Sequence, residues 1–168
     1  MNTDIEIRSA TIEDLEMIKS IFSEWLSSEE TEHYTEAVRQ RIEKSPESIK
    51  YGNHYFVSVL DGTVIGVAGY RKPIPKLQQF VSTDNPAELS MLYVTSSHRG
   101  GKGIGTALLS TIIDQTKKEG YLELVVRSSE KFKDSGWGFY DKFEDLERVG
   151  QPTPPESKQV SQVWAMKY

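Results

Sequence analysis

The stretch SSHRGGKGIGTALL, residues 96–109, places four glycines within six positions and then passes directly into a helix-forming run. The segment before it, AELSMLYV at 87–94, is rich in apolar residues and predicts a central strand. A strand that leads through glycines into a helix leaves backbone N–H groups unpaired at the positive end of the helix dipole. Such an arrangement binds anions, so the sequence predicts a ligand that carries phosphate.

Two common phosphate-binding motifs do not fit the letters of this loop. A Walker A loop needs Gly-Lys followed by Ser or Thr, but Lys102 is followed by Gly103. The dinucleotide fingerprint needs a third glycine or alanine three residues after Gly105, and that position is Leu108. A glycine-rich turn without a ligand is the plainer alternative, but four glycines carry an entropic cost that a simple turn does not demand.

The rest of the chain alternates between strand and helix patterns. Strands are predicted at IEIRSA (5–10), on both sides of the Asp61-Gly62 hairpin signal in HYFVSVLDGTVIGVAGYR (54–71), at YLELVVR (121–127) and at QVWAMKY (162–168). Helices are predicted at 11–28, where Thr11 and Asp14 have the spacing of a capping box, at 31–45, at 104–118 and at 133–143. Loops that contain prolines are predicted at 72–86 and 151–158.

Composition and charge argue against several classes of protein. No run approaches the roughly 18 apolar residues of a membrane span, and the acidic start MNTDIEIRSA is unlike a signal peptide, so a cytoplasmic protein is expected. Cysteine is absent and His33, His54 and His98 are scattered, so neither thiol nor metal chemistry is expected. The net charge is −5, and the first 32 residues hold nine acidic side chains against Arg8 and Lys19. This surface disfavours nucleic acid and would attract a cationic small molecule or a basic peptide, but a solvated acidic helix face is the preferred interpretation.

The sequence resembles the GNAT superfamily of acyl-CoA-dependent N-acyltransferases. The matching segments are LYVTSSHRGGKGIGTALL (92–109), LELVVR (122–127) and GFYDKF (138–143). The resemblance implies an α+β or α/β fold, with a mixed sheet of about six to seven strands splayed between strands 4 and 5 and flanked by about four helices. It implies a single domain over residues 1–168, acetyl-CoA as the cosubstrate and no metal, and it allows a homodimer.

The resemblance also implies which residues bind acetyl-CoA. In the family, a loop of the form Arg/Gln-x-x-Gly-x-Gly/Ala wraps the pyrophosphate, and the preceding strand offers backbone groups to the pantetheine arm. The implied cofactor-binding residues are Leu92, Tyr93, Val94, Arg99, Gly100, Gly101, Lys102, Gly103, Ile104, Gly105 and Thr106. The chain departs from the pattern by one position, because Gly100 stands where the family has Arg or Gln and the arginine comes one residue earlier.

Two residues match positions with catalytic roles in the family. Glu88 lies six residues before Val94, where protein-acetylating members carry a general base. Tyr140, in GFYDKF, matches the tyrosine that protonates the departing thiolate. Both residue types are also common at such positions without any catalytic role. The family usually continues this helix with Gly-Phe, whereas the chain has Phe-Glu-Asp-Leu at 143–146, which predicts a different helix end.

The implied function is direct transfer of an acetyl group from acetyl-CoA to a primary amine of a small molecule or peptide, in a ternary complex. The acceptor is left open. Residues suited to an ammonium are Trp25, Glu29, Glu30 and Tyr34, whereas those suited to an acceptor that also carries a carboxylate are Arg71, Lys72 and Lys76. Two other classes remain as alternatives, a non-catalytic acyl-CoA-binding sensor on the same fold and a different nucleotide- or phosphate-binding enzyme.

Overall fold

The computed structural model describes residues 4–152 and 160–168, so most of the loop predicted at 151–158 lies outside the described residues. Seven strands form one sheet in the order β1-β2-β3-β4-β5-β7-β6. β4 is the middle strand, as its apolar sequence predicts, and it pairs with β5 in parallel, whereas β5 pairs with β7 antiparallel. The predicted mixed sheet is therefore confirmed. The chain divides into two compact units, residues 1–71 with 90–112 and residues 72–89 with 113–168.

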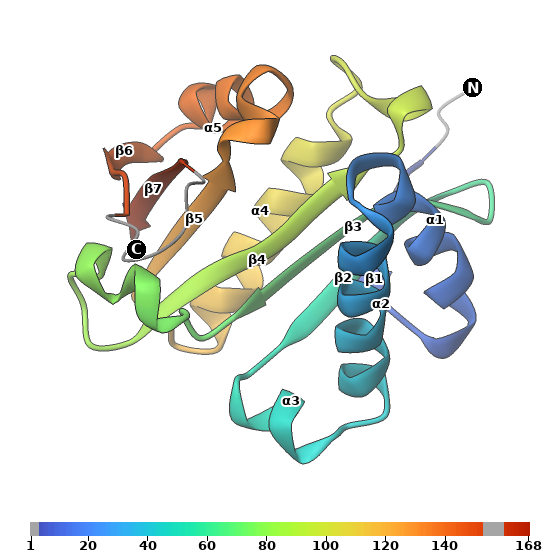
Figure 1. The fold of residues 1–168 in the computed structure, drawn as a ribbon, viewed down its shortest axis with the longest axis horizontal. Helices are drawn as coiled ribbons and strands as arrows, with labels where there is room; N and C mark the ends of the chain where they lie inside the picture. The colour runs from blue at the N-terminus through green and yellow to red at the C-terminus, as the bar shows by residue number, and fades with distance from the viewer. Residues whose placement is uncertain (1–3, 153–159) are drawn as a thin grey trace. The chain divides into compact units, whose positions relative to one another are not determined.

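The first unit holds the N-terminal strands and helices. Its elements are β1 (Glu6–Ser9), η1 (Ile12–Asp14), α1 (Leu15–Trp25), α2 (Ser28–Ile42), α3 (Pro46–Lys50), β2 (His54–Leu60), β3 (Thr63–Arg71), the second part of β4 (Pro86–Val94), η3 (Ser96–His98) and the first part of α4 (Ile104–Lys118). The blue helices α1 and α2 pack on the hairpin formed by β2 and β3 (Figure 1). The core between them is apolar and includes Ile18, Ile21, Phe22, Val38, Tyr55, Val57, Val67 and Met91.

The predicted hairpin and the predicted start of the first helix are both confirmed. Asp61 and Gly62 have φ angles of 48° and 76°, and two positive values are what a type I′ hairpin turn requires. At the helix start, the backbone N–H of Thr11 donates to the Asp14 carboxylate at 2.7 Å. Arg8 donates to the same buried carboxylate, so burial of Asp14 is compensated by an ion pair.

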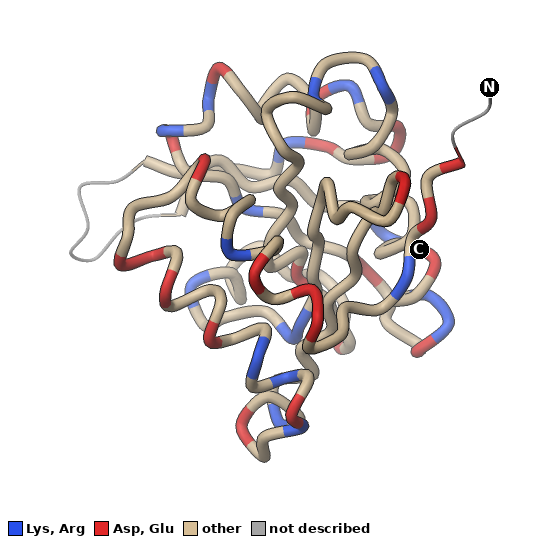
Figure 2. Tube along the Cα trace, turned by 90° about the vertical axis from the view of Figure 1, so that its right-hand side faces the viewer, with Lys and Arg blue, Asp and Glu red and all other residues tan. Residues whose placement is uncertain are grey.

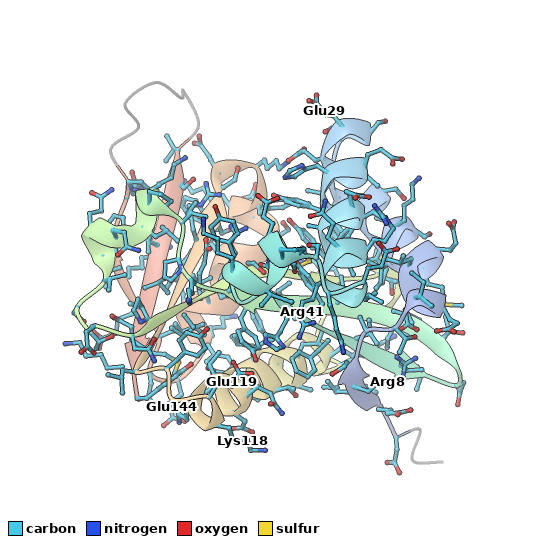
Figure 3. The ribbon with its side chains drawn as sticks, turned by 90° about the horizontal axis from the view of Figure 1, so that it is seen from below. Arg8, Glu29, Arg41, Lys118, Glu119 and Glu144 are labelled. Atoms are coloured by element: carbon cyan, nitrogen blue, oxygen red, sulfur yellow. The ribbon has the colours of Figure 1, made fainter. Side chains whose placement is uncertain are left out.

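The second helix begins earlier than predicted. Ser27 is its N-cap, because its hydroxyl accepts a hydrogen bond from the backbone N–H of Glu30 at 3.2 Å. The resulting helix α2 has acidic residues in its first turn and arginines in its last, which complements the helix dipole. Figure 3 labels Glu29 and Arg41 near these opposite ends. The single helix predicted at 31–45 is thus replaced by α2 and the short α3.

Several acidic side chains of the first 32 residues have structural partners. Figure 2 marks the acidic positions along the chain in red. Glu24 accepts a hydrogen bond from the backbone N–H of Ser96 at 2.8 Å. Glu32 pairs with Lys19 at 2.6 Å. The acidic excess of the first 32 residues is therefore partly used to cap helices and to join segments.

The second unit holds the remaining elements. These are η2 (Pro75–Phe80), the first part of β4, the end of α4, β5 (Glu123–Ser129), η4 (Glu130–Phe132), the π-helical turn η5 (Lys133–Trp137), α5 (Gly138–Lys142), β6 (Glu147–Gly150) and β7 (Ser161–Lys167). The helix predicted at 133–143 is thus a π turn followed by a short α-helix, and η2 lies within the predicted loop at 72–86. No helix of residues 4–152 or 160–168 is both long and apolar enough to cross a membrane.

The chain leaves α5 through residues that differ from the Gly-Phe pair expected from the family pattern. Asp145 has a φ angle of 68°, the left-handed conformation that glycine adopts most easily. The following residue, Leu146, is buried. Strand β6 then begins at Glu147. The sequence does not predict this strand, because it is short, largely exposed and at the edge of the sheet.

Candidate functional site

The glycine loop has a left-handed backbone at three of its glycines. The φ angles are 80° at Gly100, 82° at Gly101 and 75° at Gly103, and no atom lies within 4 Å of a Cβ built on any of them. The hydrogen-bond ladder of α4 starts where the N–H of Ala107 donates to the Gly103 carbonyl at 2.9 Å. Three amides precede this ladder at the positive helix end, those of Ile104, Gly105 and Thr106. The loop therefore offers an open backbone surface for a phosphate group.

The C-terminal end of α1 holds the start of this loop. Trp25 donates from its indole nitrogen to the Val94 carbonyl at 3.0 Å, at the end of β4. The Arg99 guanidinium lies over the indole ring, 4.6 Å from its centroid. Arg99, displaced by one position from the family pattern, is thus oriented by a cation–π contact. Sequence reasoning assigned Trp25 to the acceptor and missed this role, because the two partners lie 69 residues apart.

The loop also carries its own side-chain contacts and two exposed cations. His98 Nδ1 lies 3.0 Å from the hydroxyls of both Thr95 and Ser97. Lys102 donates to the Ser97 carbonyl at 3.3 Å. Because Arg99 and Lys102 are both exposed, the loop presents positive side chains as well as backbone amides to solvent.

The end of β4 offers backbone rather than side chains. Tyr93 packs edge-on against Phe22 with ring centroids 5.8 Å apart, so its side chain belongs to the core of the first unit. Leu92 and Val94 are half-buried. That a ligand meets the backbone groups of these positions stays a prediction, and the Val94 carbonyl already accepts the hydrogen bond from Trp25.

The two predicted catalytic residues lie in the second unit, on opposite faces of its strands. Glu88 is the register partner of Val125, so the two side chains share one face of the sheet. Tyr140 packs on Trp164 with ring centroids 5.1 Å apart, and Trp164 is the register partner of Val126. Because Val125 and Val126 are consecutive in β5, they point to opposite faces. The structure therefore does not bring Glu88 and Tyr140 into contact.

Both predicted catalytic side chains are buried. Glu88 is 2% exposed and Tyr140 is 8% exposed. Burial raises the pKa of the Tyr140 phenol above its ordinary value, so this hydroxyl keeps its proton at neutral pH. The Tyr140 ring packs against the aromatic rings of Phe139 and Trp164, with centroids 5.2 and 5.1 Å away. A protonated donor is therefore held in a largely apolar setting, which strengthens any hydrogen bond that it makes to a ligand.

The residue after Tyr140 fixes the short helix α5. The Asp141 carboxylate accepts hydrogen bonds from Arg148 at 2.8 Å and from the Trp164 indole nitrogen at 3.0 Å. The hydrogen bonds from Arg148 lower the pKa of Asp141. A five-residue helix has little stability by itself, so these contacts with β6 and β7 set the position of Tyr140.

A second buried carboxylate lies on the same sheet face as Glu88 and has a structural role. Glu123 is 1% exposed and accepts four hydrogen bonds of 2.7 to 3.1 Å from the backbone N–H groups and hydroxyls of Ser82 and Thr83. Burial opposes ionisation, but these donors outweigh it and lower the pKa of Glu123. Glu123 therefore anchors the segment that leads into β4. The sequence carries no local signal for this contact, because Ser82 and Thr83 precede Glu123 by about 40 residues.

Replacing Glu123 with glutamine is expected to lower the free energy of unfolding by about 2 to 3 kcal/mol at pH 7, because an amide cannot accept all four hydrogen bonds. The depressed pKa in the folded state means that the wild-type carboxylate stabilises the fold above pH 4.5, the ordinary Glu value, and that this stabilisation disappears as the pH falls through the folded-state pKa. Urea unfolding of both proteins between pH 7 and pH 3 tests this. A difference between them that does not shrink on acidification would contradict the anchoring role.

The chain was compared with families, curated proteins and solved structures. The model of the acetyltransferase (GNAT) family matches residues 15–143. No curated protein shows a significant match. A GNAT-family acetyltransferase structure from Desulfovibrio desulfuricans has a TM-score of 0.79 at 16% identity, over 98% of this chain and 99% of that one. The PaiA N-acetyltransferase from Thermoplasma acidophilum, solved with coenzyme A, has a TM-score of 0.67 at 22% identity, over 98% and 99%.

A third structure, a ribosomal-protein-alanine N-acetyltransferase from Brucella melitensis, has a TM-score of 0.67 at 22% identity, over 97% of this chain and 99% of that chain. At these identities the similar structures establish the fold, and the family match, which spans more than half of the chain, establishes the family. The chain is a member of the GNAT acetyltransferase family.

Proposed function

We propose that this protein transfers the acetyl group of acetyl-CoA to a primary amine of a small molecule or peptide, with residues 1–168 acting as a single catalytic domain. The observation that carries the proposal is the loop from Arg99 to Gly103, with its left-handed glycines, which leads into the free amides of α4. These amides and the cations Arg99 and Lys102 suit the pyrophosphate of coenzyme A. A cytoplasmic location remains a prediction.

The two buried residues supply the proton transfers that the reaction needs. Glu88 takes one proton from the acceptor ammonium, and the resulting amine nitrogen forms a bond to the acetyl carbonyl carbon. As the tetrahedral intermediate collapses, the carbon–sulfur bond breaks and Tyr140 gives its proton to the sulfur, which leaves as coenzyme A thiol. The second proton on nitrogen passes to water, and water returns a proton to the phenol, because Glu88 and Tyr140 lie on opposite sheet faces.

A thiol-release assay with acetyl-CoA and a panel of primary amines tests the proposed function, with mass spectrometry of the products. The expected result is thiol release that depends on the amine, together with a product heavier by one acetyl group. Tight acetyl-CoA binding that is unaffected in the Glu88→Gln, Tyr140→Phe double variant, without thiol release from any amine, would instead favour an acyl-CoA sensor.

Replacing Tyr140 with phenylalanine is expected to lower kcat about 10- to 100-fold and to leave acetyl-CoA affinity unchanged. The lost contact is a hydrogen bond to a sulfur that develops negative charge, and such bonds contribute about 1.5 to 3 kcal/mol. The matched control is Tyr168→Phe. The Tyr168 hydroxyl contacts Thr116 at 2.5 Å, so this variant should lose stability but retain its kcat. Equal kcat values for Tyr140→Phe and the wild type would remove Tyr140 from the mechanism.

A further inference from the structure

Arg127 lies in the second unit, and its Nε has no hydrogen-bond partner among residues 4–152 and 160–168. It lies on β5, it is only partly exposed, and its Nε is fully buried with no hydrogen-bond partner. No ion pair or other hydrogen bond joins it to residues 4–152 or 160–168. A buried donor of a charged group that finds no partner is unfavourable for the folded protein alone. Arg127 as a whole is partly exposed, so a ligand that carries negative charge can pair with its guanidinium group.

The strand register places Arg127 on the same sheet face as Glu88. Glu88 pairs with Val125, and Arg127 is two residues farther along β5, so all three side chains point the same way. Neighbouring strands lie about 4.8 Å apart and each residue advances about 3.3 Å, which puts the Cα atoms of Glu88 and Arg127 roughly 8 Å apart. Both side chains are long enough to reach two groups of one small molecule.

The surroundings of Arg127 are apolar. Its register partner on β7, Val163, is fully buried in a cluster with Leu77 and Val125. Glu123, which lies on the same face, accepts hydrogen bonds from Ser82 and Thr83. An arginine in such a low-dielectric setting attracts an anion more strongly than one in water, and its planar guanidinium suits a bidentate carboxylate.

We infer that the amine acceptor also carries a carboxylate, which Arg127 binds while Glu88 receives the proton of the amine. This inference rests on the proposed function. The acceptor class is therefore an amino acid, or a small molecule in which a short spacer separates a primary amine from a carboxylate. The structure favours this zwitterionic class over polyamines and aminoglycosides, which would bring only positive charge towards Arg127.

The test compares matched acceptors in the thiol-release assay. Each proteinogenic amino acid is paired with its carboxamide, which keeps the amine and removes the negative charge. For the best acid, the wild type should show a kcat/KM about 100-fold above that of its amide. Arg127→Met should bring this ratio close to one, and Arg127→Lys should restore part of it. The control Arg39→Met removes an exposed arginine from α2 and should leave the ratio unchanged.

Two further readouts separate acceptor binding from other roles of Arg127. The thermal unfolding midpoint of the Arg127→Met variant should equal that of the wild type, because no hydrogen bond or ion pair within the protein is lost. A lower midpoint, together with equal losses of kcat/KM for acids and amides, would show a structural role and overturn the inference. A weaker acetyl-CoA affinity in Arg127→Met would assign the residue to the cosubstrate and also overturn the inference.

If amides react as well as acids in the wild type, the acceptor inference fails while the acetyltransferase function stands. If neither acids nor amides release thiol, whereas amines without a carboxylate do, the inference fails in the same way. Thiol release from no amine at all would contradict the function as well.

Discussion

Glu88→Gln is expected to lower kcat by about 10²- to 10⁴-fold, the range that a positioned general base contributes. The substitution keeps the size of the side chain and removes its ability to accept a proton. Because Glu88 is buried in β4, its position is fixed by the strand rather than by a flexible loop. Steady-state kinetics of the wild type and the variant with the same amine measure this loss.

The matched control for this experiment is Glu123→Gln, the same change on the same sheet face. Both carboxylates are almost fully buried, but Glu123 is held by Ser82 and Thr83 and has a structural role. The control should lose stability and keep the kcat of the wild type. If Glu88→Gln keeps most of its activity, water or another residue is the base.

Gly103→Val is expected to weaken acetyl-CoA binding about 5- to 150-fold, which corresponds to about 1 to 3 kcal/mol. Gly103 has a φ angle of 75°, a conformation that a β-branched residue adopts only with strain, and it immediately precedes α4. No protein atom lies within 4 Å of its Cβ position, so the substituent would not clash within the protein. The valine would instead displace the backbone amides and occupy the space in front of them, where the phosphate is expected.

A matched glycine lies beyond the other end of the same helix. Gly120 has a φ angle of 88° and equally open space around its Cβ position. Gly120→Val should therefore cause a comparable loss of stability without any loss of acetyl-CoA affinity. Calorimetric titration of both folded variants makes the comparison. Equal affinities would show that the glycine loop does not hold the cosubstrate.

Much of the fold could be predicted because its signals are local. At the Asp61-Gly62 turn and at the glycines before α4, a few neighbouring residues are enough to predict the backbone conformation. The elements that the sequence did not predict depend on long-range contacts or have weak local patterns. Strand β6 pairs only at the sheet edge, and the start of α2 is set by the cap at Ser27, which lies inside the helix predicted at 11–28.

The candidate site was predictable in part for the same reason. The glycine loop is a contiguous segment, so its residues could be named from the sequence. The contact of Trp25 with Val94 and Arg99, the anchoring of Ser82 by Glu123, and the shared face of Glu88 and Arg127 each join segments far apart in the chain. Strand register decides the last of these, and a shift of one residue would place Arg127 on the other face.

Calorimetric titration of the wild-type protein with acetyl-CoA, with ATP and NAD as controls, tests whether the glycine loop binds acetyl-CoA. We expect saturable binding of acetyl-CoA in the micromolar range, weaker binding of ATP and NAD, and competition by free coenzyme A. An absence of acetyl-CoA binding, or preferential binding of ATP or NAD, would contradict this expectation and would assign this loop to a different phosphate ligand.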